Sequence, residues 1–132
     1  MNYFIAYRHT GEDPQRLFQL LPAVREAFFG QHHVVYCTYF DEDTFASAQY
    51  SARDIMEHAF RKIEEMGHLF VVQDSTEKSE GMIMEVGYCR AKGIPITLAK
   101  RRAIFGTYLP DMADRVFEYA TIEELEGIIS RL

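Results

Sequence analysis

The sequence lacks the marks of several protein classes. Cysteine occurs only twice, and the two residues, Cys37 and Cys89, form no Cys-x-x-Cys pair, which argues against a disulfide scaffold and a structural zinc site. No apolar run approaches the roughly 20 residues of a membrane span. Lys and Arg number 14 against 20 Asp and Glu, so there is no broad basic field to hold a nucleic-acid backbone. We expect a soluble cytoplasmic protein with reduced thiols and with neither a membrane nor a polymeric nucleic acid as partner.

What the chain does have is an ordinary globular composition. Of its 132 residues, 48% are hydrophobic and 26% are charged. A chain of this size buries enough surface for one core without disulfide or metal support, so we expect a single domain over residues 1–132. The adjacent His32 and His33 are not spaced to bind one metal ion, and we expect no metal and no cofactor.

Short apolar runs alternate with helical periodicity along the chain. The apolar runs predict five β-strands, at residues 2–7, 33–38, 68–72, 94–98 and 115–119. The periodicity and capping signals predict four helices, at residues 14–30, 51–66, 81–92 and 122–132. Residues 39–50 are expected to form a polar and aromatic connection, and residues 100–102 an irregular basic stretch.

This alternation of strand and helix predicts an α/β fold. Right-handed crossovers then give a flavodoxin-like, or Rossmann-like, three-layer sandwich with a five-stranded parallel sheet in the order 2-1-3-4-5. In that order the first and third strands form the topological switch point, beyond whose carboxyl ends ligands bind. The loops that meet there are residues 8–13 and 73–81, and we expect the functional site between them.

Glu85 is a charged residue within an apolar stripe. Met82, Val86 and Cys89 lie on the same side of the predicted helix. Burial of an unpaired carboxylate costs several kcal/mol, so such a residue is normally paired, protonated or functional. Two interpretations stay open at this point: a carboxylate paired with a cation at a core edge or subunit contact, and a catalytic carboxylate.

The start of the same helix has the features of an anion site. Ser79, Glu80 and Gly81 follow the third strand, so backbone N–H groups and the helix dipole point toward the switch point. Gly81 allows close approach of a ligand, and the Ser79 hydroxyl can donate to a phosphate oxygen. The alternative is that Ser79 only caps the helix.

Together these residues form a recognisable motif. Ser79-x-Gly81-x-x-x-Glu85-x-Gly87, followed by residues 88–96, resembles the signature of the nucleoside 2-deoxyribosyltransferase family, in particular its 2′-deoxynucleoside 5′-phosphate N-hydrolase branch. Residues 3–8 are similar to the opening of that family, so the resemblance covers nearly the whole chain. It implies cleavage of the N-glycosidic bond between deoxyribose and base, with Glu85 as nucleophile and a ribosyl-enzyme that water or a second base resolves.

The resemblance also implies a substrate and its binding residues. Family transferases that act on unphosphorylated nucleosides have an acidic residue where this chain has Ser79, whereas the nucleotide hydrolases have a serine that contacts the 5′-phosphate. A carboxylate would repel that phosphate and a hydroxyl does not. Arg8 is the cation of the first loop and suits bidentate phosphate binding. Tyr7 and Gly11 are further candidates, with strand packing as the alternative for Tyr7.

One family residue is absent. Members usually carry an Asp on the helix before the third strand that touches the ribose, whereas the matching region here is Glu57-His58-Ala59. His58 is a candidate substitute, although a lone helical His is more often a surface or hydrogen-bonded residue. The absence motivates an alternative function, a catalytically weak nucleotide-binding module on the same fold. A more remote alternative is a redox or signalling domain that shares only the architecture.

The aromatic and methionine content predicts self-association. The chain has 10 Phe, 8 Tyr and 6 Met, more than a small sheet with four helices readily buries, and exposed apolar patches usually mark interfaces. Sites in the family are completed across subunit contacts, which points the same way. We therefore expect a symmetric homodimer in which a polar residue of segment 107–111, with Asp111 as candidate, enters the pocket of the partner.

Overall fold

A computed structural model of the protein describes residues 1–9 and 11–132. Its strands are β1 (Asn2–Ala6), β2 (Val34–Tyr36), β3 (Leu69–Gln73), β4 (Ile96–Arg101) and β5 (Arg115–Tyr119). Its helices are α1 (Pro14–Gly30), the 3-10 helix η1 (Thr38–Asp41), α2 (Glu42–Ser47), α3 (Ala52–Met66), α4 (Glu80–Lys92), α5 (Leu109–Met112) and α6 (Ile122–Ile129).

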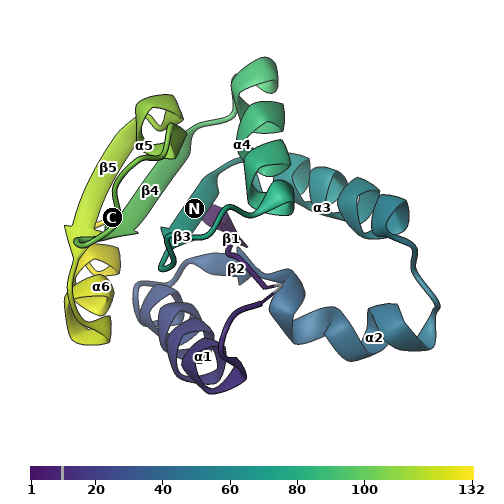
Figure 1. Ribbon diagram of the computed structural model, residues 1–132, viewed down its shortest axis with the longest axis horizontal. Helices are drawn as coiled ribbons and strands as arrows, with labels where there is room; N and C mark the ends of the chain where they lie inside the picture. Colours follow the sequence, from purple (N-terminus) through teal and green to yellow (C-terminus); the bar gives the residue numbers. More distant parts are fainter. Residues whose placement is uncertain (10) are drawn as a thin grey trace.

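The five strands form one parallel sheet in the order β2-β1-β3-β4-β5. This confirms the predicted flavodoxin-like topology, with β1 and β3 adjacent at the centre. Helices α1 and α6 cover one face of the sheet, and α3 and α4 cover the other (Figure 1). The three layers therefore enclose two apolar clusters, one on each side of the strands.

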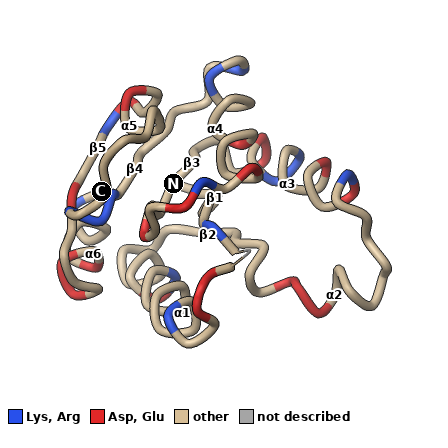
Figure 2. The backbone as a smooth tube through the Cα atoms, viewed as in Figure 1, with Lys and Arg blue, Asp and Glu red and all other residues tan. Residues whose placement is uncertain are grey.

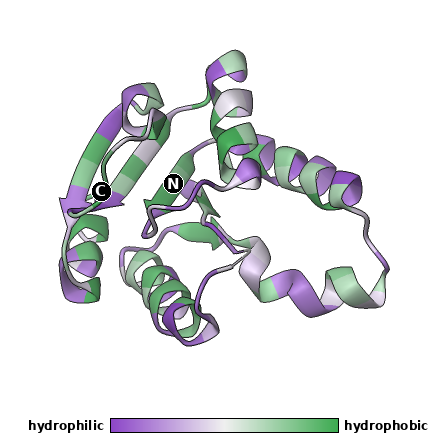
Figure 3. Ribbon diagram, viewed as in Figure 1, coloured by the Kyte–Doolittle hydropathy of each residue, from purple (hydrophilic) through white to green (hydrophobic). Residues whose placement is uncertain are grey.

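The central strand shows why the sequence pattern predicts this arrangement. Every residue of β3 is buried, because helices pack on both of its faces. Helices α3 and α6 are amphipathic, with hydrophobic positions that face the sheet and polar positions that face outward (Figure 3). None of the helices formed by the described residues is both long and apolar enough to cross a lipid bilayer.

The capping signals define where the helices begin and end. The Asp13 side chain accepts a hydrogen bond from the backbone N–H of Gln15 at 3.0 Å, and Pro14 follows as the first helical residue. Ser51 and Asp54 form the reciprocal capping box that starts α3. Gly67 and Gly93 end α3 and α4 in the left-handed conformation, which a residue without Cβ adopts at low cost.

Two predicted irregular segments contain structure. Residues 39–50 were expected to be a connection, but they contain most of η1 and all of α2. Phe45 is buried there and stacks on Tyr50 with ring centroids 5.2 Å apart. This one buried side chain anchors α2, which is too short for its sequence to show helical periodicity. The basic stretch 100–102 is also partly regular, since β4 continues to Arg101 through pairing with β5.

Candidate active site at the carboxyl ends of β1 and β3

A cavity of about 560 Å³ lies at the switch point, between α3 and α4. Its wall combines the end of β1 and the following loop, one residue of η1, one side of α3 and the first turns of α4. The described residues that line it are Ile5, Ala6, Tyr7, Arg8, His9, Thr38, Ile55, Met56, Ala59, Lys78, Ser79, Glu80, Gly81, Met82 and Glu85. The structure thus brings the candidate residues Tyr7, Arg8, Ser79, Gly81 and Glu85 to one cavity.

Glu85 is the buried charged residue of this wall. Its side chain belongs to the apolar side of α4, and the residue is only 8% exposed. Burial raises the pKa of its carboxyl group to about 8. Residues 1–9 and 11–132 supply no cation or hydrogen-bond donor that offsets this burial. The interpretation of Glu85 as half of an ion pair therefore finds no partner within the described part of the chain.

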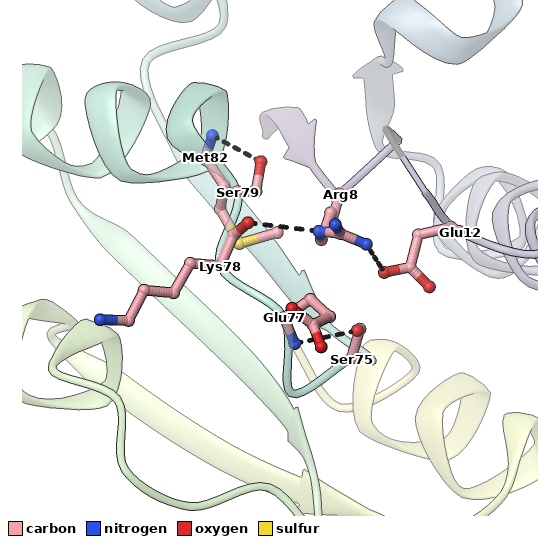
Figure 4. A network of polar contacts seen from close by, with 7 residues as sticks. All are labelled: Arg8, Glu12, Ser75, Glu77, Lys78, Ser79 and Met82. Atoms are coloured by element: carbon pink, nitrogen blue, oxygen red, sulfur yellow. Dashed lines mark hydrogen bonds and ion pairs between the residues drawn. The ribbon is translucent and has the colours of Figure 1, made fainter.

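Ser79 is the N-cap of α4. Its Oγ accepts a hydrogen bond from the backbone N–H of Met82 at 3.2 Å (Figure 4). The structural role is thus filled, but it uses only an acceptor lone pair and leaves the hydroxyl proton free to be donated. A Cβ at Gly81 would meet the Met56 sulfur at 3.8 Å, an ordinary contact, so internal packing does not require glycine at this position.

Arg8 connects the two loops of the switch point. Its Nη1 lies 2.7 Å from Glu12 Oε1, and its Nε donates to the Lys78 carbonyl oxygen at 3.3 Å (Figure 4). Gly11 has φ +81°, and a Cβ there would lie 3.1 Å from Arg8 Nη2. The left-handed turn therefore favours glycine at position 11, and a side chain there would also require a small shift of the Arg8 guanidinium.

Tyr7 and His9 share one carboxylate partner. The Tyr7 hydroxyl donates to Glu42 Oε1 at 3.0 Å, and His9 Nδ1 lies 3.0 Å from the same oxygen. Burial, together with Cys37 and Glu42, raises the pKa of Tyr7, so the phenol stays protonated. Sequence reasoning missed His9 and Glu42, because Glu42 begins a short helix in a segment predicted to be a connection.

His58 is not among the described residues that line the cavity. Its Nε2 lies 2.6 Å from the Tyr36 hydroxyl, which itself donates to Asp41 Oδ2 at 2.6 Å. Burial, followed by the charges of Lys62 and Arg61, lowers the pKa of His58. The next residue on α3, Ala59, lines the cavity instead. The geometry thus gives His58 a hydrogen-bonding role between α3 and η1.

Asp111 lines a second cavity, of about 590 Å³, which lies beside α4 and α5. Arg8, Lys78, Ser79 and Met82 line both cavities, whereas Glu85 lines only the first. Within one chain, therefore, Asp111 and Glu85 do not share a cavity. The prediction that Asp111 enters the site of a partner chain stays a prediction.

Neither cavity has the features of a metal site. Among residues 1–9 and 11–132, no three His, Cys, Asp or Glu side chains are grouped closely enough to hold a metal ion. Lys and Arg are spread over several elements instead of gathering on one of them (Figure 2). The chemistry that the first cavity offers is a buried carboxylate, a helix N-terminus with a free hydroxyl proton, a guanidinium and an imidazole.

Comparison with known families and with curated protein sequences finds no match. Solved structures do match. A conserved protein of Enterococcus faecalis V583 is 14% identical with a TM-score of 0.72, and the match covers 99% of this chain and 98% of the other. The CMP N-glycosidase of Clostridium botulinum is 12% identical with a TM-score of 0.74, over 99% and 98% of the two chains.

A third solved structure is the 2-deoxyribosyltransferase of Bacillus psychrosaccharolyticus. It is 12% identical with a TM-score of 0.70, and the match covers 96% of this chain and 91% of the other. At such identities the likeness shows that the fold is shared along nearly the whole chain. It does not by itself transfer an activity.

Proposed function

We propose that the protein cleaves the N-glycosidic bond of a 2′-deoxynucleoside 5′-monophosphate, by hydrolysis or by transfer to another base, with Glu85 as the nucleophile. The observation that carries this proposal is a buried carboxyl group, without a partner among the described residues, on the wall of a cavity at the switch point. The shared fold supports it, since two of the similar structures are an N-glycosidase and a deoxyribosyltransferase.

The chemistry follows from the surroundings of Glu85. In its ionised form the carboxylate attacks C1′ of the sugar, the bond to the base breaks, and a glycosyl-enzyme ester forms. The transition state carries positive charge on the sugar ring, and a carboxylate in an apolar wall stabilises that charge more strongly than water does. Water, or a second base, then attacks C1′ and releases Glu85.

The 5′-phosphate would be bound at the opposite end of the sugar from the base. Ser79 donates its hydroxyl proton, and the free N–H groups of the first turn of α4 point in the same direction. Arg8 retains donors beyond those used by Glu12 and Lys78, because a guanidinium has five. The phosphate can therefore bind the remaining donors of Arg8 while Glu12 and Lys78 hold the guanidinium in place.

We also propose that the protein acts as a homodimer in the cytoplasm. Beside the second cavity, Phe105 is 79% exposed, Tyr108 is 85% exposed and Met112 is 40% exposed. Such a group of apolar side chains suits an interface. The cytoplasm contains nucleoside monophosphates and keeps thiols reduced, which suits the free Cys37 and Cys89.

A direct assay tests the proposed reaction. The protein is incubated with a panel of ribo- and deoxyribonucleoside 5′-monophosphates, and released base is followed by chromatography. Glu85→Gln should reduce release by about 1000-fold or more, since it removes the nucleophile. Glu57→Gln changes an exposed glutamate of α3 in the same way and is the matched control. Absence of base release from every substrate contradicts the proposal and favours a nucleotide-binding module.

A further inference from the structure

Cleavage of a nucleotide requires a second group besides the nucleophile. A base departs with the electron pair of the broken bond and, unless already cationic, needs a proton to leave as a stable neutral molecule. Water that later attacks the sugar must also lose a proton. The protein therefore needs a residue on the cavity wall that can act as acid and base. On α3, Ala59 faces the cavity, and its methyl side chain cannot fill this role.

The titratable residues that line the cavity leave few choices. Arg8 is permanently charged, and the proton of Tyr7 is already donated to Glu42. Glu80 adjoins Ser79, at the end of the site where the phosphate binds. The Lys78 side chain extends away from Ser79 and Arg8 (Figure 4). His9 remains, and an imidazole is the side chain that most readily exchanges protons near neutral pH.

His9 is also oriented for this task. Its side chain is 58% exposed, so it lies at the mouth of the cavity, where the base must leave and water must enter. Glu42 Oε1 lies 3.0 Å from Nδ1, which fixes a proton on Nδ1 and leaves Nε2 available for proton transfer. Tyr7 donates to the same oxygen and thereby fixes the carboxylate in place.

We propose that His9 is the catalytic acid and base of the reaction, and that Glu42 is a positioning residue that orients its imidazole. This inference rests on the function proposed above. In the first step Glu85 forms the bond to C1′, the bond between C1′ and the base breaks, and His9 Nε2 gives its proton to the base. In the second step water attacks C1′, His9 Nε2 accepts the proton of the water, and Glu85 leaves as carboxylate.

The two steps return every group to its starting state. The imidazolium becomes neutral in the first step and is protonated again in the second, so one proton serves each turnover. Glu42 orients the imidazole through its contact with Nδ1, as a carboxylate beside a catalytic histidine does in other hydrolases. The short helix α2 thereby acquires a functional role, since its first residue, Glu42, contacts Tyr7 and His9 after β1.

The test compares two purine nucleotides, one whose base needs a proton to leave and one whose base does not. One is the best-cleaved deoxyguanosine or other purine nucleotide of the panel, and the other is the 5′-monophosphate of 7-methyl-2′-deoxyguanosine, whose cationic base leaves without protonation. His9→Asn should slow cleavage of the first about 100-fold or more. Cleavage of the 7-methylated substrate should fall less than tenfold.

Matched variants separate this effect from loss of folding. His32→Asn changes an exposed histidine at a positive φ of 62°, which asparagine tolerates, and both rates should stay unchanged. Glu42→Gln should lower the first rate about tenfold and spare the second, because it leaves the imidazole in place but less well oriented. An equal loss for both substrates in His9→Asn, or no loss for either, overturns the inference.

The same assay distinguishes failure of the two proposals. If wild-type protein releases base from no nucleotide of the panel, the proposed function fails and the role of His9 fails with it. Suppose instead that wild-type protein cleaves both substrates, that Glu85→Gln abolishes both activities and that His9→Asn changes neither. The proposed function then stands, and only the role of His9 and Glu42 is wrong.

Discussion

Asp74 and Glu85 both carry a carboxyl group into the protein near the carboxyl end of β3, and their surroundings differ completely. Asp74 receives two hydrogen bonds from Arg16, at 2.8 and 2.9 Å, and one from the Tyr119 hydroxyl at 2.7 Å. Although burial alone raises the pKa of Asp74, these donors hold it below its ordinary value. Burial raises the pKa of Glu85, and no group in residues 1–9 or 11–132 opposes this shift.

This contrast separates a structural carboxylate from a candidate catalytic one. Asp74 joins α1, β3 and β5 through its two partners, so its charge stabilises the position of the loop that leads to Ser79. Glu85 makes no such contribution within the described chain, and its burial costs free energy. A protein retains an unpaired buried carboxyl group where its reactivity has a use.

The largest expected effect concerns stability at high pH. In the unfolded chain Glu85 titrates near 4.5, and in the folded protein near 8. The folded state holds the proton more tightly, so Glu85 reduces stability progressively as pH rises from about 4.5 to 8. Glu85→Gln removes this penalty and should stabilise the protein by about 3 to 5 kcal/mol at pH 9.

Urea unfolding at pH 4 and pH 9 measures the effect. At pH 4 the wild-type carboxyl group is neutral in both states, so Glu85→Gln should leave the free energy of unfolding nearly unchanged. Equal stability of the two proteins at pH 9 would mean that Glu85 is ionised at no cost and has an unrecognised partner.

The opposite result is expected for Asp74. Asp74→Asn removes the negative charge and leaves the Arg16 guanidinium beside a neutral amide, which should lower the free energy of unfolding by about 2 to 4 kcal/mol at pH 7. Asp43→Asn, in the acidic first turn of α2, is the exposed control. A destabilisation equal to that of the control would show that the Asp74 network contributes little.

A third prediction concerns the phosphate. Ser79→Asp keeps a good N-cap residue for α4 but adds a negative charge where the phosphate is proposed to bind. The affinity for a nucleoside monophosphate should fall at least about tenfold, while that for the free nucleoside changes little. Calorimetry on both ligands measures this. A parallel loss for the two ligands argues against a phosphate contact at Ser79.

The smallest expected effect concerns the contact between subunits. Light scattering coupled to gel filtration at micromolar concentration should give the mass of a dimer. If Asp111 completes the site of the partner, mixing inactive Glu85→Ala with inactive Asp111→Ala should restore up to about a quarter of the activity, since random exchange leaves some dimers with one intact site. A stable monomer with full activity refutes a shared site.

Much of the fold was accessible from the sequence because its signals are local. The unbroken apolar run of β3 indicates a strand covered on both faces, and Ser51-x-x-Asp54 forms the capping box that its spacing predicts. Ser79 and Glu85 were accessible for a similar reason, since one helix carries both. Their common cavity follows from the strand order.

The remaining parts depend on contacts that sequence spacing does not reveal. His9 and Glu42 meet only because α2 forms, and α2 depends on the burial of Phe45 against Tyr50 and His58. His58 is a related case. The resemblance matched residues 57–59 to a ribose-binding position, with His58 as a candidate substitute, but Ala59 lines the cavity and His58 contacts Tyr36.

The wall that the two cavities share has a thermodynamic consequence. Arg8, Lys78, Ser79 and Met82 line both spaces, so an occupant of the second cavity that repositions any of them alters affinity in the first. Linkage makes this effect reciprocal, and nucleotide binding must then change the affinity of that occupant by the same factor. Binding of a subunit against α4 and α5 would in this way be coupled energetically to substrate binding through the side chains that line both cavities.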